Sequence, residues 1–225
     1  MFDWRWDFAF EILPRLLLAT LNTLMAAGIG YAIALVIGLV FALAQRTPYR
    51  PVTAVVRETV EFIRSTPLVL QIFFVFYVGP QFGIRLSPWT SGMIAIGLHY
   101  ASYLSEVYRA GIDSVPRGQW EASRALNFST ARTYFRIVIP QALPASLPGM
   151  GNYLVGIFKD TPMLSVIGVA ELMHTANALG SETYRFLEPY TLVGVIFLAI
   201  SLPTAAGLRV FEAWVRRALG MTKSR

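Results

Sequence analysis

The sequence lacks cysteine and has few charged residues. Its 225 residues include 14% charged and 55% hydrophobic residues, whereas a soluble domain carries about 25% charged residues. The absence of cysteine excludes a disulfide scaffold, a thiolate metal site and thiol catalysis. The hydrophobic excess excludes a disordered chain and a nucleic-acid-binding domain. Because a bilayer span needs about 20 mostly apolar residues, the composition predicts a single all-α, polytopic membrane domain.

Motifs of several enzyme classes are also missing. The sequence contains no G-x-x-x-x-G-K-[ST] phosphate loop, no Gly-x-Ser-x-Gly and no His-Glu-x-x-His, which argues against ATP binding by this chain and against a membrane-embedded hydrolase. The two histidines, His99 and His174, are too far apart in the sequence to suggest a metal site. We therefore expect no catalytic residue and no metal ligand.

The apolar segments predict five membrane-spanning helices. The first covers residues 16–44, where no residue is ionisable and every fourth residue is small. Such a ridge lets another helix approach closely, either within the same chain or across a dimer interface. Its members are Ala26, Gly30, Ala34, Gly38 and Ala42. The other four predicted spans are 52–78, 89–107, 143–172 and 189–210.

Two of these spans contain a break. In residues 52–78 we expect a kink at Pro67, because proline leaves the carbonyl group of Ile63 without its helical hydrogen bond. In residues 143–172 the polar sequence Lys159-Asp160-Thr161-Pro162 separates two apolar stretches. Broken helices at membrane depth are tolerated where they line a pathway.

The basic residues predict the orientation of the chain. Segments 46–64, 109–136 and 209–225 hold 14 of the 19 lysines and arginines, and such segments stay in the cytoplasm. The N-terminus then lies outside and the C-terminus inside, so the net charge of +6 needs no nucleic-acid partner. The predicted parts are an outer interfacial segment (1–15), a transmembrane domain (16–215) and a basic cytoplasmic tail (216–225).

The cytoplasmic segment 109–139 is long for a connection in a compact bundle. Its pattern predicts a helix that starts near Pro116, with Asp113 or Ser114 as its cap. Asn127 suits a left-handed turn at the end of that helix. A second short helix should end before Pro140.

This segment carries a recognisable spacing. Glu121-Ala122-Ser123 is followed after three residues by Asn127, and after nine more by Ile137-Val138-Ile139-Pro140. The spacing resembles the cytoplasmic signature of ABC importer permeases, which is E-A-A, three residues, G, nine residues, I-x-L-P. Ser123, Asn127 and Ile139 depart from it. Matches to the polar amino acid uptake (histidine/glutamine permease-like) branch include Arg64-Ser65-Thr66-Pro67-Leu68, Val115-Pro116-Arg117-Gly118-Gln119, Lys159-Asp160-Thr161 and Gly168-Val169-Ala170-Glu171-Leu172.

The resemblance implies a type I ABC importer permease in a bacterial inner membrane. It implies that the chain has no cofactor of its own, because a partner ATPase subunit binds Mg-ATP. The other implied partners are membrane lipid, a second permease copy or a sister permease, and a periplasmic solute-binding protein. A coupling helix in the coupling loop (109–139) would dock on the ATPase, unless this loop is only a solvated hairpin. The implied coupling residues are Arg117, Gly118, Gln119, Glu121, Ala122, Ser123, Asn127, Ile139 and Pro140.

Ionisable residues inside a span indicate a possible solute pathway. Each of Lys159 and Asp160 costs about 2.5–3.5 kcal/mol at a helix centre, so they should line a wet cavity or form an ion pair with an acid such as Glu106. His99, Thr66 and Gln71 offer hydrogen bonds either to a solute or between helices. The candidate pathway residues are Thr66, Gln71, His99, Lys159, Asp160 and Thr161.

The resulting hypothesis is a permease subunit of an ATP-driven importer. Polar amino acids are the cargo that the resemblance implies, together with amino-acid-like zwitterions, among which a slight overall resemblance favours ectoine. The alternative is a secondary transporter or channel that has no ATPase partner. Secondary carriers often consist of two related halves, and this sequence contains no internal repeat.

Overall fold

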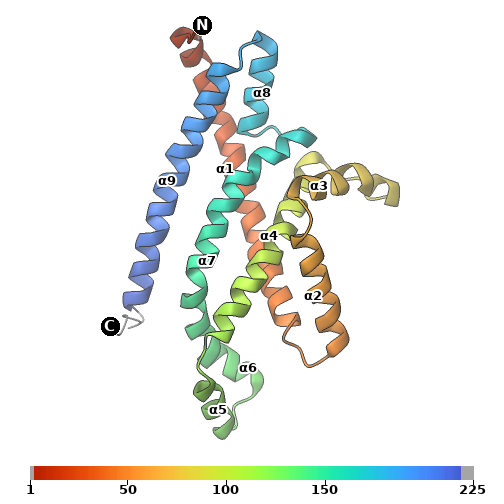
Figure 1. Ribbon diagram of the computed structural model, residues 1–225, viewed down its shortest axis with the longest axis vertical. Coiled ribbons are helices and arrows are strands. Elements are labelled where there is room, and N and C mark those ends of the chain that lie inside the picture. Colours follow the sequence, from red (N-terminus) through yellow and green to blue (C-terminus); the bar gives the residue numbers. More distant parts are fainter. Residues whose placement is uncertain (1–2, 219–225) are drawn as a thin grey trace.

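The computed structural model describes residues 3–218, and within this range it contains helices and no strand. This confirms the all-α prediction. Figure 1 shows a bundle in which α5 and α6 lie at the end opposite to the N-terminus. Of the predicted basic tail, residues 219–225 lie outside the described range. The helices are α1 (Trp6–Ala44), α2 (Arg50–Arg64), α3 (Leu68–Phe73), α4 (Pro88–Asp113), α5 (Arg117–Ala125), α6 (Thr130–Thr133), α7 (Ile139–Asp160), α8 (Leu172–Thr183) and α9 (Leu187–Ala218).

The packing of α1 against α4 forms the centre of the bundle. All five small residues of the α1 ridge are buried within the chain. A methyl group on Gly30 would lie 2.7 Å from Cγ2 of Ile96, and one on Gly38 would lie 2.9 Å from the carbonyl oxygen of Ala101. The ridge thus brings the two backbones together, which confirms the prediction of tight packing inside the subunit.

The helix after α1 breaks where proline predicts a break. Pro67 has extended backbone angles, φ −63° and ψ 137°, and precedes the first residue of α3. The chain turns by 107° between α2 and the helical segment Leu68–Phe82, so α3 projects sideways (Figure 1). The position of the predicted kink is confirmed, but residues 52–78 do not form one straight span.

The number of membrane spans stays a prediction. Within the described residues, α1 and α9 are long and apolar enough to cross a bilayer, and counting each bent pair as one span gives up to four. The helix α4, which corresponds to the predicted third span, contains several serine, tyrosine and histidine residues along with its apolar ones. Three of these polar residues, His99, Tyr100 and Tyr103, line the cavity described below, whereas Ser102 and Ser105 donate hydrogen bonds to backbone carbonyl groups of α4 itself.

The predicted interruption of the fourth span is confirmed. The helix α7 ends at Asp160, a 3₁₀ turn covers Thr161–Ile167, and Gly168 has a left-handed φ of 81°. Glu171 then caps α8, because its two carboxylate oxygens accept hydrogen bonds from the backbone N–H groups of His174 and Met173 at 2.7 and 2.9 Å. The capped turn therefore satisfies backbone donors that no water could reach in a membrane.

Side chains of α1 hold this turn in place. The amide of Asn22 donates a hydrogen bond to the carbonyl oxygen of Ala170 at 2.7 Å, and the hydroxyl of Thr23 accepts one from the N–H group of Leu172 at 3.0 Å. Near the N-terminus, Glu188 accepts hydrogen bonds from the Arg185 side chain and the Arg5 backbone N–H group. The hydrogen bond to Glu188 raises the pKa of the Arg185 guanidinium. These contacts join α1, α8 and α9 at one end of the bundle.

The glycine contacts of α1 lead to a stability prediction. Gly38→Ala should lower the free energy of unfolding by about 1–3 kcal/mol, because the new methyl group would meet the backbone of α4. Thermal unfolding of the purified chain in detergent measures this loss. The matched control is Gly28→Ala on the same helix, where nothing lies within 4 Å of the added atom. Equal unfolding temperatures for the two variants would contradict the prediction.

Candidate functional site

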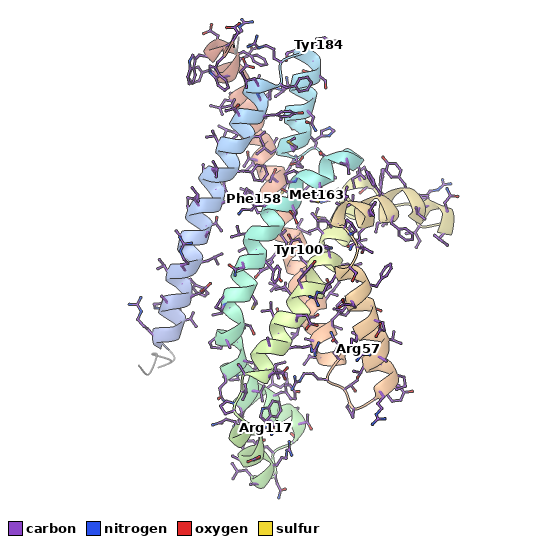
Figure 2. All side chains as sticks on the ribbon, in the orientation of Figure 1. Arg57, Tyr100, Arg117, Phe158, Met163 and Tyr184 are labelled. Carbon is purple, nitrogen blue, oxygen red and sulfur yellow. The ribbon has the colours of Figure 1, made fainter. Side chains whose placement is uncertain are left out.

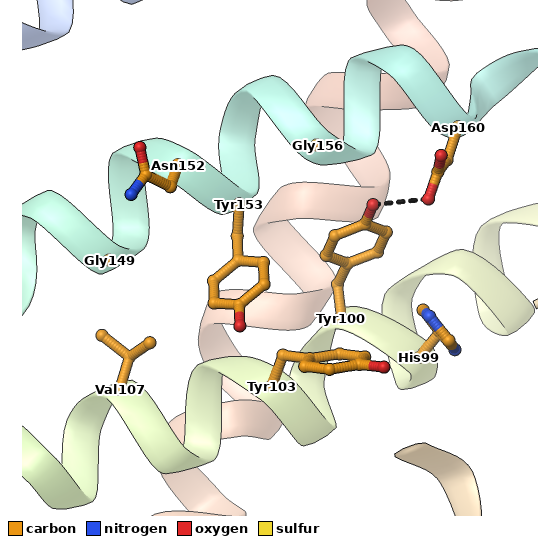
Figure 3. Close-up of a pocket in the computed structure, with 9 residues that line it drawn as sticks. All are labelled: His99, Tyr100, Tyr103, Val107, Gly149, Asn152, Tyr153, Gly156 and Asp160. Atoms are coloured by element: carbon orange, nitrogen blue, oxygen red, sulfur yellow. Dashed lines mark hydrogen bonds between the residues drawn. The ribbon is translucent and has the colours of Figure 1, made fainter. Parts of the chain in front are cut away.

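A cavity of about 550 Å³ lies between α4 and α7. Figure 3 shows its lining side chains, which come from both helices. On α7, a methyl group added to Gly149 would lie 2.8 Å from Val107, and one added to Gly156 would lie 3.2 Å from the Tyr100 hydroxyl, so these glycines let side chains of α4 approach α7 closely. The lining residues are His99, Tyr100, Tyr103, Val107, Gly149, Asn152, Tyr153, Gly156 and Asp160.

Tyrosine side chains and one carboxylate give the cavity its chemistry. The rings of Tyr100, Tyr103 and Tyr153 contact one another with centroid distances of 5.5–6.3 Å. The hydroxyl of Tyr100 donates a hydrogen bond to Oδ2 of Asp160 at 2.6 Å (Figure 3). The Arg64 guanidinium lies over the Tyr103 ring, 5.4 Å from its centroid. The cavity thus offers hydroxyl groups, aromatic surfaces and a negative charge.

Asp160 has no cationic partner in the described part of the chain. None of the ion pairs found there includes it. Glu106, the acid considered as an ion-pair partner for Lys159, instead binds Arg109 at 2.9 Å. An unpaired carboxylate at membrane depth indicates a functional site. The geometry therefore favours the pathway interpretation of Asp160 over a structural ion pair.

The two neighbours of Asp160 lie elsewhere. Lys159 lines a separate pocket of about 290 Å³, where it faces α9 residues such as Phe197. Thr161 is fully buried, and its hydroxyl donates a hydrogen bond to the carbonyl oxygen of Phe158 at 2.8 Å. Of these three candidate residues, only Asp160 reaches the tyrosine cavity.

Gln71 connects the break between α2 and α3 to the cavity. Its amide nitrogen donates hydrogen bonds to the carbonyl oxygen of Ile63 at 2.7 Å and to the Thr66 hydroxyl at 2.8 Å. Ile63 is the residue whose carbonyl group Pro67 leaves free. The amide oxygen of Gln71 lies 3.2 Å from Nδ1 of His99, which lines the cavity. Thr66 and Gln71 have structural bonds here, while His99 has both a structural bond and access to the cavity.

The residues predicted to couple the chain to the ATPase lie at the end of the bundle opposite to the N-terminus (Figure 1). Arg117 marks this end in Figure 2. Most of the predicted residues on α5 are exposed, namely Arg117, Gly118, Gln119, Glu121 and Ala122. Ser123 is buried, and its hydroxyl donates a hydrogen bond to the Trp120 carbonyl oxygen at 2.8 Å. Ile139 and Pro140 are exposed at the start of α7.

Asn127 turns the chain back after α5. Its φ of 55° is left-handed, which confirms the predicted turn. Trp120 and Tyr134, one from each side of the turn, then pack edge to face with a centroid distance of 5.5 Å. Val115 and Val138 are buried next to them. The loop is therefore a compact unit with its own small core.

Two expectations for this loop are wrong. Neither Asp113 nor Ser114 caps α5, since Pro116 precedes its first residue and no side chain bonds to that end. Ser114 instead follows α4, and its hydroxyl donates a hydrogen bond to Gly111. The chain also stays helical through Pro140, because a π-helical turn at Tyr134–Val138 joins α6 to α7. Pro140 is tolerated because it lies in the first turn of α7, directly after the π-helical turn.

Sequence reasoning missed Tyr100 and Tyr153 as site residues. The available signal was spacing: Tyr100 and Tyr103 are three residues apart, and Tyr153 and Asp160 are seven apart, so each pair shares a helix face. A helix face with two polar side chains, found on each of two helices, is a stronger indication of a shared cavity than a single polar residue is.

Comparison with known families accounts for this arrangement. A family model described as "Binding-protein-dependent transport system inner membrane component" matches residues 34–217. This chain belongs to that family. The matched range includes the tyrosine cavity, the broken helices and the coupling loop, so each of them is part of this transport component.

Relatives of this transport component cover almost its whole length. The probable amino-acid ABC transporter permease protein y4tG of Sinorhizobium fredii is 40% identical over 94% of this chain and 95% of its own. The probable glutamine ABC transporter permease protein GlnM of Bacillus subtilis is 33% identical over 85% and 88%. The crystal structure of an amino acid ABC transporter with histidines superposes with a TM-score of 0.87, at 31% identity, over 94% of this chain and 99% of that one.

These comparisons define the role of the chain. It is the membrane permease subunit of an ATP-driven importer, it is an integral protein of the inner membrane, and it is not an enzyme, because ATP hydrolysis belongs to a separate subunit. Importers of this family combine an ATPase, a substrate-binding protein and permeases. The permease interpretation is confirmed against the alternative of a carrier that works without an ATPase.

The hydrogen bonds of Gln71 lead to a prediction about the permease fold. Gln71→Leu should lower the free energy of unfolding by about 1–3 kcal/mol, because it removes the hydrogen bonds that the Gln71 amide donates to the Ile63 carbonyl group and to the Thr66 hydroxyl. Thermal unfolding of the purified permease measures the change. Gln81→Leu, at an exposed position of the next helical segment, is the control and should leave the unfolding temperature unchanged. If Gln71→Leu left the unfolding temperature unchanged, the bend between α2 and α3 (the elbow) would not depend on this amide.

Proposed function

We propose that this permease carries polar amino acids or amino-acid-like zwitterions, and that the tyrosine cavity is part of their pathway. The observation that carries the proposal is the Asp160 carboxylate, which lines the cavity and forms no ion pair with any of the described residues. A zwitterionic solute brings an ammonium or amidinium group that can take this place. Its desolvation in a low-dielectric site is offset by the carboxylate and by the aromatic surfaces.

The rest of the cavity suits the same class of solute. The Asn152 side chain and the tyrosine hydroxyls can hydrogen-bond to polar groups of the cargo, and His99 borders the cavity on the side of Gln71. A volume of about 550 Å³ accommodates a single amino acid with water. Lys159 and Thr161 do not contact the solute and contribute only to the helix break after Asp160. Thr66 and Gln71 likewise contribute only to the bend between α2 and α3.

Coupling to ATP hydrolysis takes place at the coupling loop. The exposed face of α5 docks in a groove of the ATPase subunit, with Glu121 and Ala122 in its middle and Asn127 shaping its end. Exposed Ile139 and Pro140 connect this face to α7, whose other end carries Asp160. A displacement of α5 therefore reaches the pathway along one helix.

The proposal includes the orientation of the permease in the membrane and its partner proteins. The N-terminus and α8 face the periplasm, and the C-terminus and α5 face the cytoplasm, as the distribution of basic residues indicates. A second permease copy or a sister permease completes the pathway, and a periplasmic binding protein delivers the solute. Figure 2 places Tyr184 and Arg117 at the two opposite ends.

The Asp160 proposal leads to a transport prediction. In proteoliposomes that contain the complete importer, Asp160→Asn should lower the uptake of solute about tenfold, the effect of losing roughly 1.4 kcal/mol of interaction with the cationic group. Uptake of radiolabelled solute per assembled complex is the measurement. Asp7→Asn, at an exposed position near the N-terminus, is the control and should transport normally. Unchanged uptake by Asp160→Asn would refute the assignment of the cavity to the pathway.

The coupling proposal leads to a docking prediction. Ala122→Trp should prevent copurification of the ATPase subunit, because a large ring on the exposed face of α5 cannot enter the same groove. The permease itself should unfold at the wild-type temperature, since Ala122 has no buried contacts to lose. Ala131→Trp, exposed on α6, serves as the matched control. Retention of the ATPase by Ala122→Trp would place the docking surface elsewhere.

The cargo is best identified with the periplasmic binding protein, because that partner selects the solute. Calorimetric titration of the cognate binding protein with polar amino acids and with ectoine separates the two candidate classes. Competition of the same compounds for uptake by the reconstituted importer checks that the permease follows this selection.

A further inference from the structure

Arg46 forms a contact between the coupling loop and α1 that no motif marks. It lies in the connection between α1 and α2, and its Nη1 donates a hydrogen bond to Oδ1 of Asp113 at 2.5 Å. Asp113 is the last residue of α4 and lies in the first part of the coupling loop. The Arg46 side chain is 26% exposed and the Asp113 side chain 59%, so the arginine is the more buried partner.

A second side chain of the loop strengthens this contact. Burial alone would lower the pKa of the Arg46 guanidinium, but hydrogen bonds to Asp113 and Tyr134 raise it above its ordinary value. Tyr134 packs edge to face on Trp120 of α5. Arg46 therefore touches both ends of the coupling loop, the end of α4 and the start of the helix that leads into α7.

Gln45, which caps the end of α1 and directly precedes Arg46, also forms a side-chain contact with α4. Oε1 of Gln45 accepts a hydrogen bond from Arg109 of α4 at 2.9 Å, and the same guanidinium binds Glu106 at 2.9 Å. Farther from the coupling loop, the backbones of α1 and α4 are in close contact at glycines such as Gly38. This contact prevents the two helices from sliding along each other. The two helices are thus held together from the coupling loop into the bundle.

The helix α1 reaches the opposite end of the molecule. Its 39 residues span about 58 Å at 1.5 Å per residue. Asn22 and Thr23 of this helix hold the turn between α7 and α8, which follows the break at Asp160. A movement of α1 therefore displaces the segment next to the cavity.

We propose that Arg46 is a positioning residue for energy coupling, which makes α1 follow the coupling loop when the ATPase subunits close. The proposal rests on the proposed docking of α5 on the ATPase. Without Arg46, the loop moves α4 and α7 through the backbone but moves α1 less. ATP is then hydrolysed with less solute transported. As an ordinary surface ion pair, the contact would contribute only about 0–1 kcal/mol to stability and nothing to coupling.

The test measures the number of solute molecules transported per ATP hydrolysed in proteoliposomes with the complete importer. Arg46→Gln and Asp113→Asn should each lower this ratio about fivefold, at the lower end of the usual range of coupling free energies, with ATP hydrolysis retained. The exchanged pair Arg46→Asp with Asp113→Arg should recover at least part of the ratio. Arg57→Gln, which removes an exposed ion pair with Glu58 on α2, is the control and should leave it unchanged.

Two results separate this inference from the proposed function. Wild-type ratios in both Arg46→Gln and Asp113→Asn would overturn the positioning role and leave the docking of α5 intact. An importer that retained its ATPase subunit and its transport despite Ala122→Trp would instead refute the docking on which the inference rests. If Arg46→Gln does not assemble, Asp113→Asn alone decides, because its side chain is exposed and of the same size.

Discussion

The close contact between α1 and α4 is the constraint on which the rest of the permease depends. Lipid provides no hydrophobic force between helices, so their association depends on packing and on polar bonds. The buried ridge of α1 brings the α4 backbone within reach, at positions such as Gly38 against Ala101. With α4 fixed in this way, one of its faces is free to form the cavity with α7, and its end carries the coupling loop.

The broken helices satisfy their polar backbone groups through side chains. At the elbow, Gln71 supplies the donor that Pro67 removes from Ile63. At the second break, Glu171 accepts bonds from two backbone N–H groups, and Asn22 of α1 donates to the neighbouring carbonyl group. Unsatisfied groups would cost several kcal/mol each in hydrocarbon. Irregular backbone therefore occurs beside the cavity because specific side chains complete it.

Much of this arrangement could be predicted from sequence, because its causes are local. The ridge at every fourth residue, the break at Pro67 and the left-handed turn at Asn127 each follow from residue type and spacing. The 107° bend could not be predicted, since proline permits a range of angles and packing selects one. The tyrosine cluster depends on the rotation of α4 relative to α7. The Arg46 contact joins residues 67 positions apart, which no single-sequence pattern reveals.

The two charges at the end of α7 illustrate how position on a helix decides function. Lys159 and Asp160 are neighbours in sequence, yet successive residues point about 100° apart around a helix. Asp160 consequently reaches the tyrosines, whereas Lys159 faces the groove beside α9. If Lys159 and Asp160 formed an ion pair with each other, the carboxylate would not be available to bind a cationic group of the solute. Because they do not, the carboxylate stays available on the cavity side, where the Tyr100 hydroxyl is the one group among the described residues that bonds to it. The helix break after Asp160 fixes this division, since a continued helix would surround the carboxylate with the side chains of its next turn.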